Sequence, residues 1–94
     1  MRESDFEQYL LDDNGIVSKT KAVRSRLNKG RMIERHLGVS LDEIVNDDNK
    51  TYKALLRIKE EMKDVNGTLS NALRKYYMFI NSKAFPALSE YKES

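Results

Sequence analysis

The sequence contains no cysteine and a single proline, and its apolar runs are only a few residues long. The absence of cysteine excludes a disulfide scaffold and a thiolate metal site, and it fits a reducing compartment. Runs this short cannot cross a bilayer, and acidic residues in the first ten positions interrupt the apolar core that a secretory signal needs. We therefore expect a cytoplasmic protein that makes no contact with a membrane.

Strand patterns are missing as well, since no period-two alternation and no hairpin turn occurs between β-branched runs. The 94 residues are 39% hydrophobic and 34% charged, which is typical of one globular domain with a modest core. These values are too apolar for a disordered chain. The sequence therefore predicts a single ordered domain over residues 1–94.

Helix signals occur throughout the chain. Capping boxes begin at Ser4 and at Ser40, each with a glutamate three positions later. We expect a first helix from Ser4 to Asn14-Gly15, a second from Ser18 to residue 36 or 37, a short turn over 40–45, a third long helix near 49–64, and a last helix over 69–82 capped by Thr68. This predicts an all-α fold, a compact four-helix domain with a short extra helical turn after the second helix.

The end of the chain is expected to return to the core. Phe85, Pro86 and Leu88 provide apolar groups after the last helix. The residues from about 86 to 94 are otherwise polar, and chain ends of this kind are commonly poorly ordered. We expect them to form a loosely attached tail.

Charge is distributed unevenly along the chain. Residues 1–17 carry a net charge of −4, and residues 18–37 carry +6, although the whole chain carries only +2. Such asymmetry is typical of a protein with a polyanionic partner on one face.

The basic segment divides into two sides when it is drawn as a helix at 100° per residue. Its apolar side is interrupted by Gly30, which predicts either a close approach by another helix or a kink. Its polar side forms what we call the basic stripe: Lys21, Arg24, Asn28, Arg31 and Arg35.

The basic stripe has the chemistry of a DNA-binding surface. Arginine forks suit phosphates and guanine edges, and Asn28 can pair with an adenine edge. The stripe is about 20 Å long, which fits a helix lying along a major groove. An ordinary solvated helix surface is the alternative.

The last helix offers a second polar stripe, which consists of Ser70, Arg74, Tyr77 and Asn81, with Asn71 and Lys75 beside it. Thr68, Ser70 and the N–H groups of the first turn are placed where a helix N-terminus can hold a phosphate. The alternative remains that Thr68 and Ser70 only cap the helix and that Tyr77 only covers the edge of the core.

The layout resembles a known family. The segments are "DFEQYLL", "VSKTKAVRSRLNKGRMIERHLG", "SLDEIVNDDNKTYKALLRIKEEM" and the closing "TLSNALRKYYMFI". They are similar to the SAM-like, N-terminal core-binding domain of tyrosine recombinases, the phage-integrase type. The resemblance implies a SAM-like bundle that grips duplex DNA with its second and fourth helices. DNA would be contacted by Lys21, Arg24, Asn28 and Arg31 from the second, and by Thr68, Ser70, Arg74 and Lys75 from the fourth.

Catalysis by this chain is not expected. The family carries its nucleophilic tyrosine in a second domain, for which this chain has no room. Asp47 and Asp48 lie in a polar cluster that favours a loop and a helix cap over a metal pair. His36, the only histidine, is expected to stabilise a helix C-terminus.

We expect no cofactor and no metal. The expected partners are double-stranded DNA and a catalytic recombinase domain or another protein.

A different class of function also fits the sequence. Met32 is expected on the exposed side of the basic helix, and Met78 on a similar side of the last helix. Methionines surrounded by cations are typical of adaptable binding surfaces. The alternative is therefore a small protein-interaction or dimerisation module.

Overall fold

The computed structural model describes residues 1–12 and 19–92. For residues 19 and 20 it describes the backbone alone. The helix end predicted at Asn14-Gly15 and the cap predicted at Ser18 lie outside the described residues. All regular structure in the described segments is helical: α1 (Glu3–Leu11), α2 (Lys19–Leu37), α3 (Leu41–Val45), α4 (Asp48–Glu61) and α5 (Thr68–Asn81). The predicted all-α class is confirmed, with the short helix directly after the basic one.

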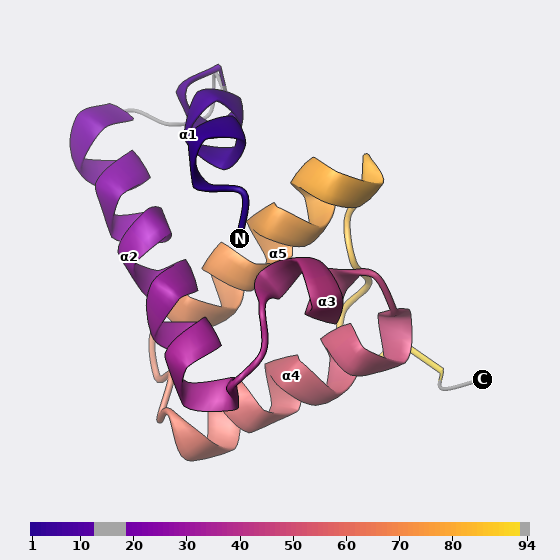
Figure 1. Ribbon diagram of the computed structural model, residues 1–94. Coiled ribbons are helices and arrows are strands. Elements are labelled where there is room, and N and C mark those ends of the chain that lie inside the picture. The colour runs from indigo at the N-terminus through magenta and orange to yellow at the C-terminus, as the bar shows by residue number, and fades with distance from the viewer. Residues whose placement is uncertain (13–18, 93–94) are drawn as a thin grey trace.

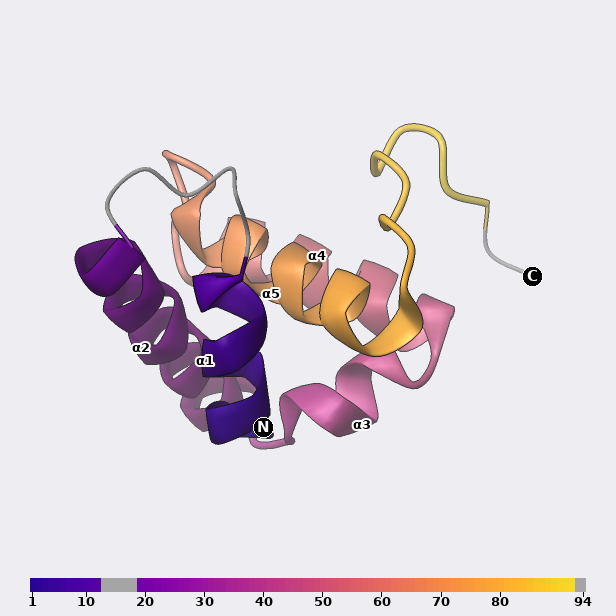
Figure 2. The ribbon, with the colours of Figure 1, turned by 90° about the horizontal axis from the view of Figure 1, so that it is seen from above.

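Helix α5 occupies the middle of the molecule (Figure 1). It contacts each of the other four helices, and its contact with α2 is the most extensive. Helix α1 lies against α2 on one side of α5, whereas α3 and α4 pack together on the other, as the view from above also shows (Figure 2). Within the described segments, none of the helices combines the length and the apolar composition that a bilayer crossing requires.

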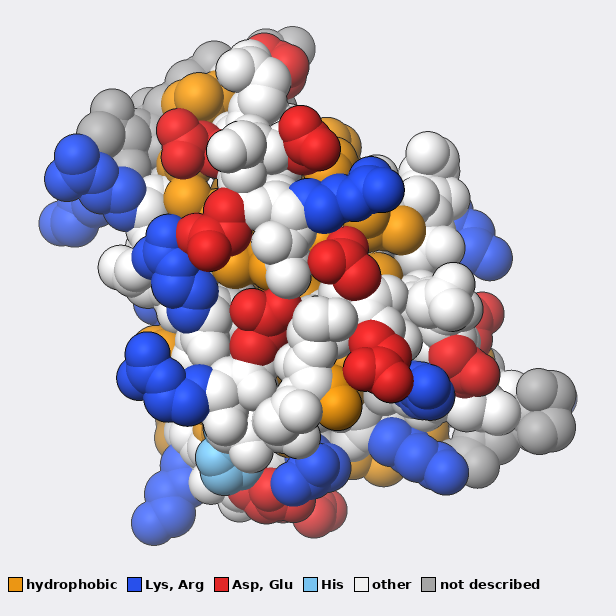
Figure 3. Space-filling model, viewed as in Figure 1, with side chains coloured by type: hydrophobic (Ala, Val, Ile, Leu, Met, Phe, Trp, Pro, Cys, Tyr) orange, Lys and Arg blue, Asp and Glu red, His pale blue; other side chains and the backbone are white. Residues whose placement is uncertain are grey.

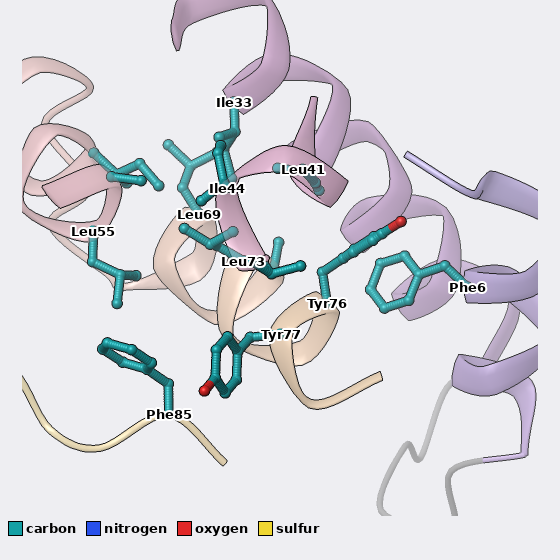
Figure 4. Close-up of a cluster of buried hydrophobic side chains, with 14 of the residues drawn as sticks. Phe6, Ile33, Leu41, Ile44, Leu55, Leu69, Leu73, Tyr76, Tyr77 and Phe85 are labelled. Atoms are coloured by element: carbon teal, nitrogen blue, oxygen red, sulfur yellow. The ribbon is translucent and has the colours of Figure 1, made fainter. Parts of the chain in front are cut away.

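The core is formed by all five helices and by the segment that follows α5 (Figure 4). Phe6 of α1 contacts Tyr76 of α5, with ring centroids 4.9 Å apart. On the other side of α5, Tyr77 meets Phe85 at 5.1 Å. Adjacent residues of one helix therefore join the two halves of the core.

Gly30 marks a close approach, as the sequence predicted. A Cβ atom at this position would lie 3.2 Å from Cδ1 of Leu41 and 2.9 Å from Sδ of Met1. Helix α2 continues through the glycine to Leu37, so the approach of these two residues, and no break in the helix, accounts for it.

Two of the predicted helix starts are confirmed. Ser40 caps α3 by accepting a hydrogen bond from the N–H of Glu43 at 3.2 Å. Asp47 caps α4 by accepting from the N–H of Lys50 at 3.1 Å, which is the structural role expected for this cluster.

The other two predicted caps are wrong. Helix α1 begins at Glu3, before Ser4, because the N–H of Phe6 already bonds to the carbonyl of Arg2. Helix α5 begins at Thr68, and Gly67, in the left-handed conformation with φ 72°, precedes it without a side-chain cap. The capping function comes from upstream, because the Asp64 carboxylate accepts from the N–H groups of Leu69 at 3.0 Å and Ser70 at 2.9 Å.

The segment after α5 is held more firmly than the sequence suggested. Phe85 is buried, as expected, and Leu88 packs partly against the core, whereas Pro86 is exposed. Tyr91 stacks on Tyr52 at 4.9 Å, lies 5.1 Å from Phe85, and donates a hydrogen bond to Asn49. The chain is thus anchored to α4 as far as Tyr91, which differs from the expected loose tail.

Candidate nucleic-acid interface

All five residues of the basic stripe are exposed on α2. In Figure 3, Lys and Arg side chains line the outer edge of this helix, and acidic side chains of α1 lie beside them. The helix that the sequence singled out by charge therefore does present that charge on a surface.

Acidic residues of α1 approach part of the stripe. Arg31 forms an ion pair with Glu3, in which Nε donates to Oε1 at 2.8 Å, and its Nη1 donates to Oδ1 of Asn28 at 2.7 Å. Glu7 lines the same shallow hollow as Arg24 and Asn28. Arg31 and Asn28 are therefore partly engaged within the protein, which a projection of α2 alone could not show.

The remaining stripe cations have no acidic partner in the described part of the chain. Among the described residues, no carboxylate pairs with Lys21, Arg24 or Arg35. These three side chains span about 21 Å along the axis of α2. They are open to an external anion.

Glu34, the single acid of α2, is turned away from the stripe. Its Oε2 accepts from the Met1 ammonium group at 2.8 Å and from the N–H of Leu41 at 2.8 Å. Burial alone would lower the pKa of the Met1 amine, but the hydrogen bonds and charges of Glu34 and Asp42 outweigh it, and the pKa is raised. The carboxylate of Glu34 thus pairs with the amine at the chain start, and it does not offset the positive charge of the exposed face of α2.

The second polar stripe serves the fold. Tyr77 donates to Oδ1 of Asp48 at 2.8 Å, and Asn81 donates to the carbonyl of Val45 at 3.1 Å. Arg74 donates from Nη1 to the carbonyls of Phe85 at 2.9 Å and Pro86 at 3.2 Å. These side chains hold α5 to its neighbours.

The predicted phosphate cradle at the start of α5 is already occupied. The hydroxyl of Ser70 donates to Oδ2 of Asp64 at 2.8 Å, in addition to the two backbone bonds that this carboxylate accepts. Burial raises the pKa of Asp64, but these hydrogen bonds outweigh it and the pKa is lowered. A negative side chain of the protein itself takes the place that the sequence assigned to a phosphate.

A cleft between α2 and α5 lies on the other flank of α2. It consists of two neighbouring hollows of about 200 Å³ and about 160 Å³ that share Arg26 and Asn71 as lining residues. We call this the α2/α5 cleft. Its polar and charged lining residues are Ser25, Arg26, Lys29, Thr68, Asn71, Arg74 and Lys75.

Sequence reasoning missed Arg26 and Lys29. Arg26 lies close to the apolar side of the helix in projection, where a long side chain can cover the core and still deliver its charged end to the edge. Thr68 and Lys75, assigned to DNA contact through the resemblance, are placed in this cleft, and Asn71 lies between them. Of the residues predicted on α5, Ser70 bonds within the fold, Thr68 and Lys75 line the cleft, and Arg74 does both.

His36 connects the ends of α2 and α4. Its Nε2 lies 2.9 Å from Oε1 of Glu61, and this oxygen also accepts a hydrogen bond from Nη2 of Arg57 at 3.1 Å. The hydrogen bonds of Arg57 and then of His36 lower the pKa of the Glu61 carboxyl to about 2. The only histidine takes part in a contact between helices.

Two further positions bear on function. Met32 is exposed, with 47% of its surface accessible, as expected, but Met78 is half-buried and lines the α2/α5 cleft, so the expectation for Met78 is wrong. In the described part of the chain, no three His, Asp or Glu side chains come together in a way that could hold a metal ion.

Comparisons with protein-family models, with curated proteins and with solved structures found no match to this chain. The recombinase resemblance therefore depends on the segments quoted above, and the functional argument depends on the charges and their positions.

Proposed function

We propose that this chain is a non-catalytic duplex-DNA-binding module that grips DNA with the exposed face of α2, as a SAM-like core-binding domain of the tyrosine-recombinase type would. One observation supports this most directly. Lys21, Arg24 and Arg35 are exposed and have no acidic partner among the described residues, while the single acid of the helix faces the chain start.

The electrostatics favour a polyanion. Helix α2 contains seven cations and a single acid, which faces inward, and among the described residues the stripe forms one ion pair with α1, between Arg31 and Glu3. A duplex offers a regular row of phosphates, so several cations can be neutralised at once with release of counterions. Exposed arginines add the capacity for bidentate contacts with phosphates or guanines.

The structure narrows which residues we assign to DNA. The stripe supplies Lys21, Arg24 and Arg35. Asn28 and Arg31 become available if the ion pair between Arg31 and Glu3 opens. From α5 the proposal keeps Thr68. It gives up Ser70 and Arg74, which are bonded within the protein, and Lys75, which also has an interaction there. Strand cleavage in this proposal belongs to a separate recombinase domain acting as partner.

The test is a titration of the protein against a labelled generic duplex, followed by fluorescence anisotropy at two salt concentrations. With about four phosphates neutralised, affinity should fall roughly 100-fold between about 50 and about 200 mM salt. The double variant Arg24→Gln and Arg35→Gln should weaken binding and reduce the slope of log affinity against log salt by about 2.

A matched control keeps the net charge equal. Lys53 and Lys59 are exposed on α4, and replacing both with Gln removes the same two charges from another helix. If this control weakens binding as much as the α2 variant, the claimed face is wrong. If the wild-type protein does not bind DNA even at the lower salt, the proposed function is wrong.

A protein-interaction module is the second candidate. Met32 supports it, since a large apolar side chain stands exposed among the cations of α2. Self-association that persists at the higher salt, together with no DNA binding in the same titration, would favour this function.

A further inference from the structure

Each nitrogen of the Arg31 guanidinium donates a hydrogen bond within the protein. Nε and Nη2 both donate to Oε1 of Glu3, the first at 2.8 Å, and Nη1 donates to Oδ1 of Asn28 at 2.7 Å. Because an arginine has no acceptor atom, the amide atom of Asn28 that faces it must be the oxygen. Arg31 therefore fixes which way round the Asn28 amide lies.

The amide nitrogen of Asn28 remains open. Its N–H groups have no acceptor among the described residues, and the residue is exposed. The oxygen becomes available only if the ion pair between Arg31 and Glu3 opens, whereas the N–H groups are available in the structure as it stands. Toward an external molecule, Asn28 is therefore a hydrogen-bond donor without an acceptor. Bidentate pairing with adenine needs both, so the oxygen would first have to leave Arg31.

Arg24 adds further donors next to Asn28. It lies one turn earlier on the same side of α2 and lines the same shallow hollow. It is exposed, and no carboxylate in the described part of the chain pairs with it. Glu7 of α1 also lines this hollow, where its carboxylate repels a phosphate. A base edge, which offers acceptors together with a donor, suits this set of groups better than the DNA backbone does.

Guanine matches donors that lie side by side. Its major-groove edge carries two neighbouring acceptors, O6 and N7, and the paired cytosine adds an N4 donor next to them. Adenine instead places its N6 donor beside N7, so a side chain that can only donate meets another donor there. Arg24 and Asn28 can supply the two donors for guanine, and Glu7 can accept from cytosine.

We propose that Arg24 and Asn28 recognise the major-groove edge of guanine, and that Glu3 and Arg31 are positioning residues that set this preference by holding the oxygen of Asn28. This inference rests on the proposed function and deepens it, because it names the base that the stripe prefers. Glu3 acts through its neighbours: it holds the guanidinium of Arg31, which holds the amide of Asn28.

The experiment measures the affinity of the full chain for four labelled duplexes, by fluorescence anisotropy at one low salt concentration. Two duplexes, built from guanine·cytosine and inosine·cytosine pairs, present O6 and N7 in the major groove. The other two, built from adenine·thymine and diaminopurine·thymine pairs, present N6 and N7. Within each set the duplexes differ only by an amino group in the minor groove, which controls for groove shape. Both duplexes of the first set should bind about tenfold more tightly than both of the second.

The outcomes separate this inference from the proposed function. Equal affinity for all four duplexes, a preference for the second set, or affinities that follow the minor-groove amino group would overturn the guanine preference and leave the DNA function standing. If none of the four duplexes binds, the proposed function itself is wrong.

Arg31→Met separates positioning from charge. It releases the oxygen of Asn28, so the preference for the first set should shrink to within about twofold. Arg35→Met removes the same charge from the stripe without touching Asn28, and it should weaken binding to all four duplexes alike and keep the preference. If the Arg31→Met protein keeps the full preference, Arg31 does not set it.

The role of Glu3 is tested without DNA, in the NMR spectrum of the full chain labelled with nitrogen-15. Glu3→Gln should shift the Nε–Hε signal of Arg31 and the side-chain amide signals of Asn28. Glu60→Gln removes the same charge from an exposed position on α4 and should leave these signals unchanged. Asn28 signals that stay in place in the Glu3→Gln protein would overturn the positioning role of Glu3.

Discussion

Individual polar side chains in this protein serve mainly to close helix ends and to tie helices together. Asp64 provides the start of α5 with its hydrogen-bond acceptors from four residues upstream of the helix, and Asp48 and Asp42, in the first turns of their own helices, accept from tyrosines of the core. Burial and these carboxylates raise the pKa of both tyrosines, that of Tyr77 to about 12. Carboxylates near helix N-termini also interact favourably with the helix dipole.

Replacing Asp64 tests the unusual cap. Asp64→Ala should lower the free energy of unfolding by about 1–2 kcal/mol, because three hydrogen bonds are lost at the start of α5. Since the folded-state pKa of Asp64 is lowered, its contribution is present above its ordinary value of 3.8 and is lost as the pH falls through the folded-state pKa. Urea unfolding near neutral pH and in acid measures both effects.

The control for this prediction is Thr68→Ala. Thr68 is exposed and forms no cap, so its replacement should change stability by less than about 0.5 kcal/mol. A larger loss for Thr68→Ala than for Asp64→Ala would contradict the structure at this helix start.

At the level of helices, the sequence predicted where most of them lie but not which polar sides face outward. The apolar spacing places α2, α4 and α5 within a few residues, because burying an apolar stripe is a local requirement. Arg74 and Asn81 lie on a polar side that is equally compatible with binding DNA. They bond inward because the backbone carbonyls of residues 85 and 45 lie within hydrogen-bond distance of them. The path of those two segments depends on the whole fold.

The candidate site was likewise predictable only in the features that belong to a single helix. Exposure of the basic stripe follows from helix geometry, whereas the ion pair between Arg31 and Glu3 depends on where α1 lies. The α2/α5 cleft needs two helices that are distant in sequence, so neither helix alone indicates it. In the sequence, the signal for such a cleft is a long cation at the boundary between the apolar and polar sides of a helix, as Arg26 is in α2.

The segment after α5 gives a prediction at this scale. Tyr91→Ala removes a ring that stacks on Tyr52 and contacts Phe85, together with a hydrogen bond to Asn49, and it should cost about 2 kcal/mol of unfolding free energy. Glu90→Ala, next to it and exposed, should cost less than about 0.5 kcal/mol. Equal midpoints in urea for the two variants would mean that the segment is not anchored.

In the molecule as a whole, the chain start joins helices that are far apart in sequence. The side chain of Met1 is almost fully enclosed, and its ammonium group pairs with Glu34 of α2 at 2.8 Å and with Asp42 of α3 at 3.3 Å. One residue later, the N–H of Arg2 donates to the hydroxyl of Tyr76 in α5 at 2.9 Å. The chain start thus links α2 and α3 through one positive charge and α5 through a backbone N–H.

This arrangement predicts a loss of stability in mild alkali. Because the folded-state pKa of the amine is raised above 8.0, its contribution is complete below that pH and declines as the pH rises through the folded-state pKa. Unfolding free energy should therefore fall between pH 8 and about 9.5, which is below the ordinary ionisation of tyrosine near about 10.

Glu34→Gln keeps a hydrogen-bond acceptor for the Met1 amine but removes one of the two carboxylate charges that pair with it. The decline between these pH values should be shallower in this variant, as measured by urea titrations at several pH values. A decline of equal steepness in both proteins would show that other groups cause it.

The central position of α5 has a consequence for biosynthesis. A ribosome makes this helix after the other four, yet it is the one that all of them contact. Until residues 68–81 emerge from the exit tunnel, Phe6, Ile33 and Leu41 lack much of the surface against which they are buried. We therefore expect the first four helices to remain loosely collapsed in the nascent chain and the fold to form in one late step, after α5 has been made.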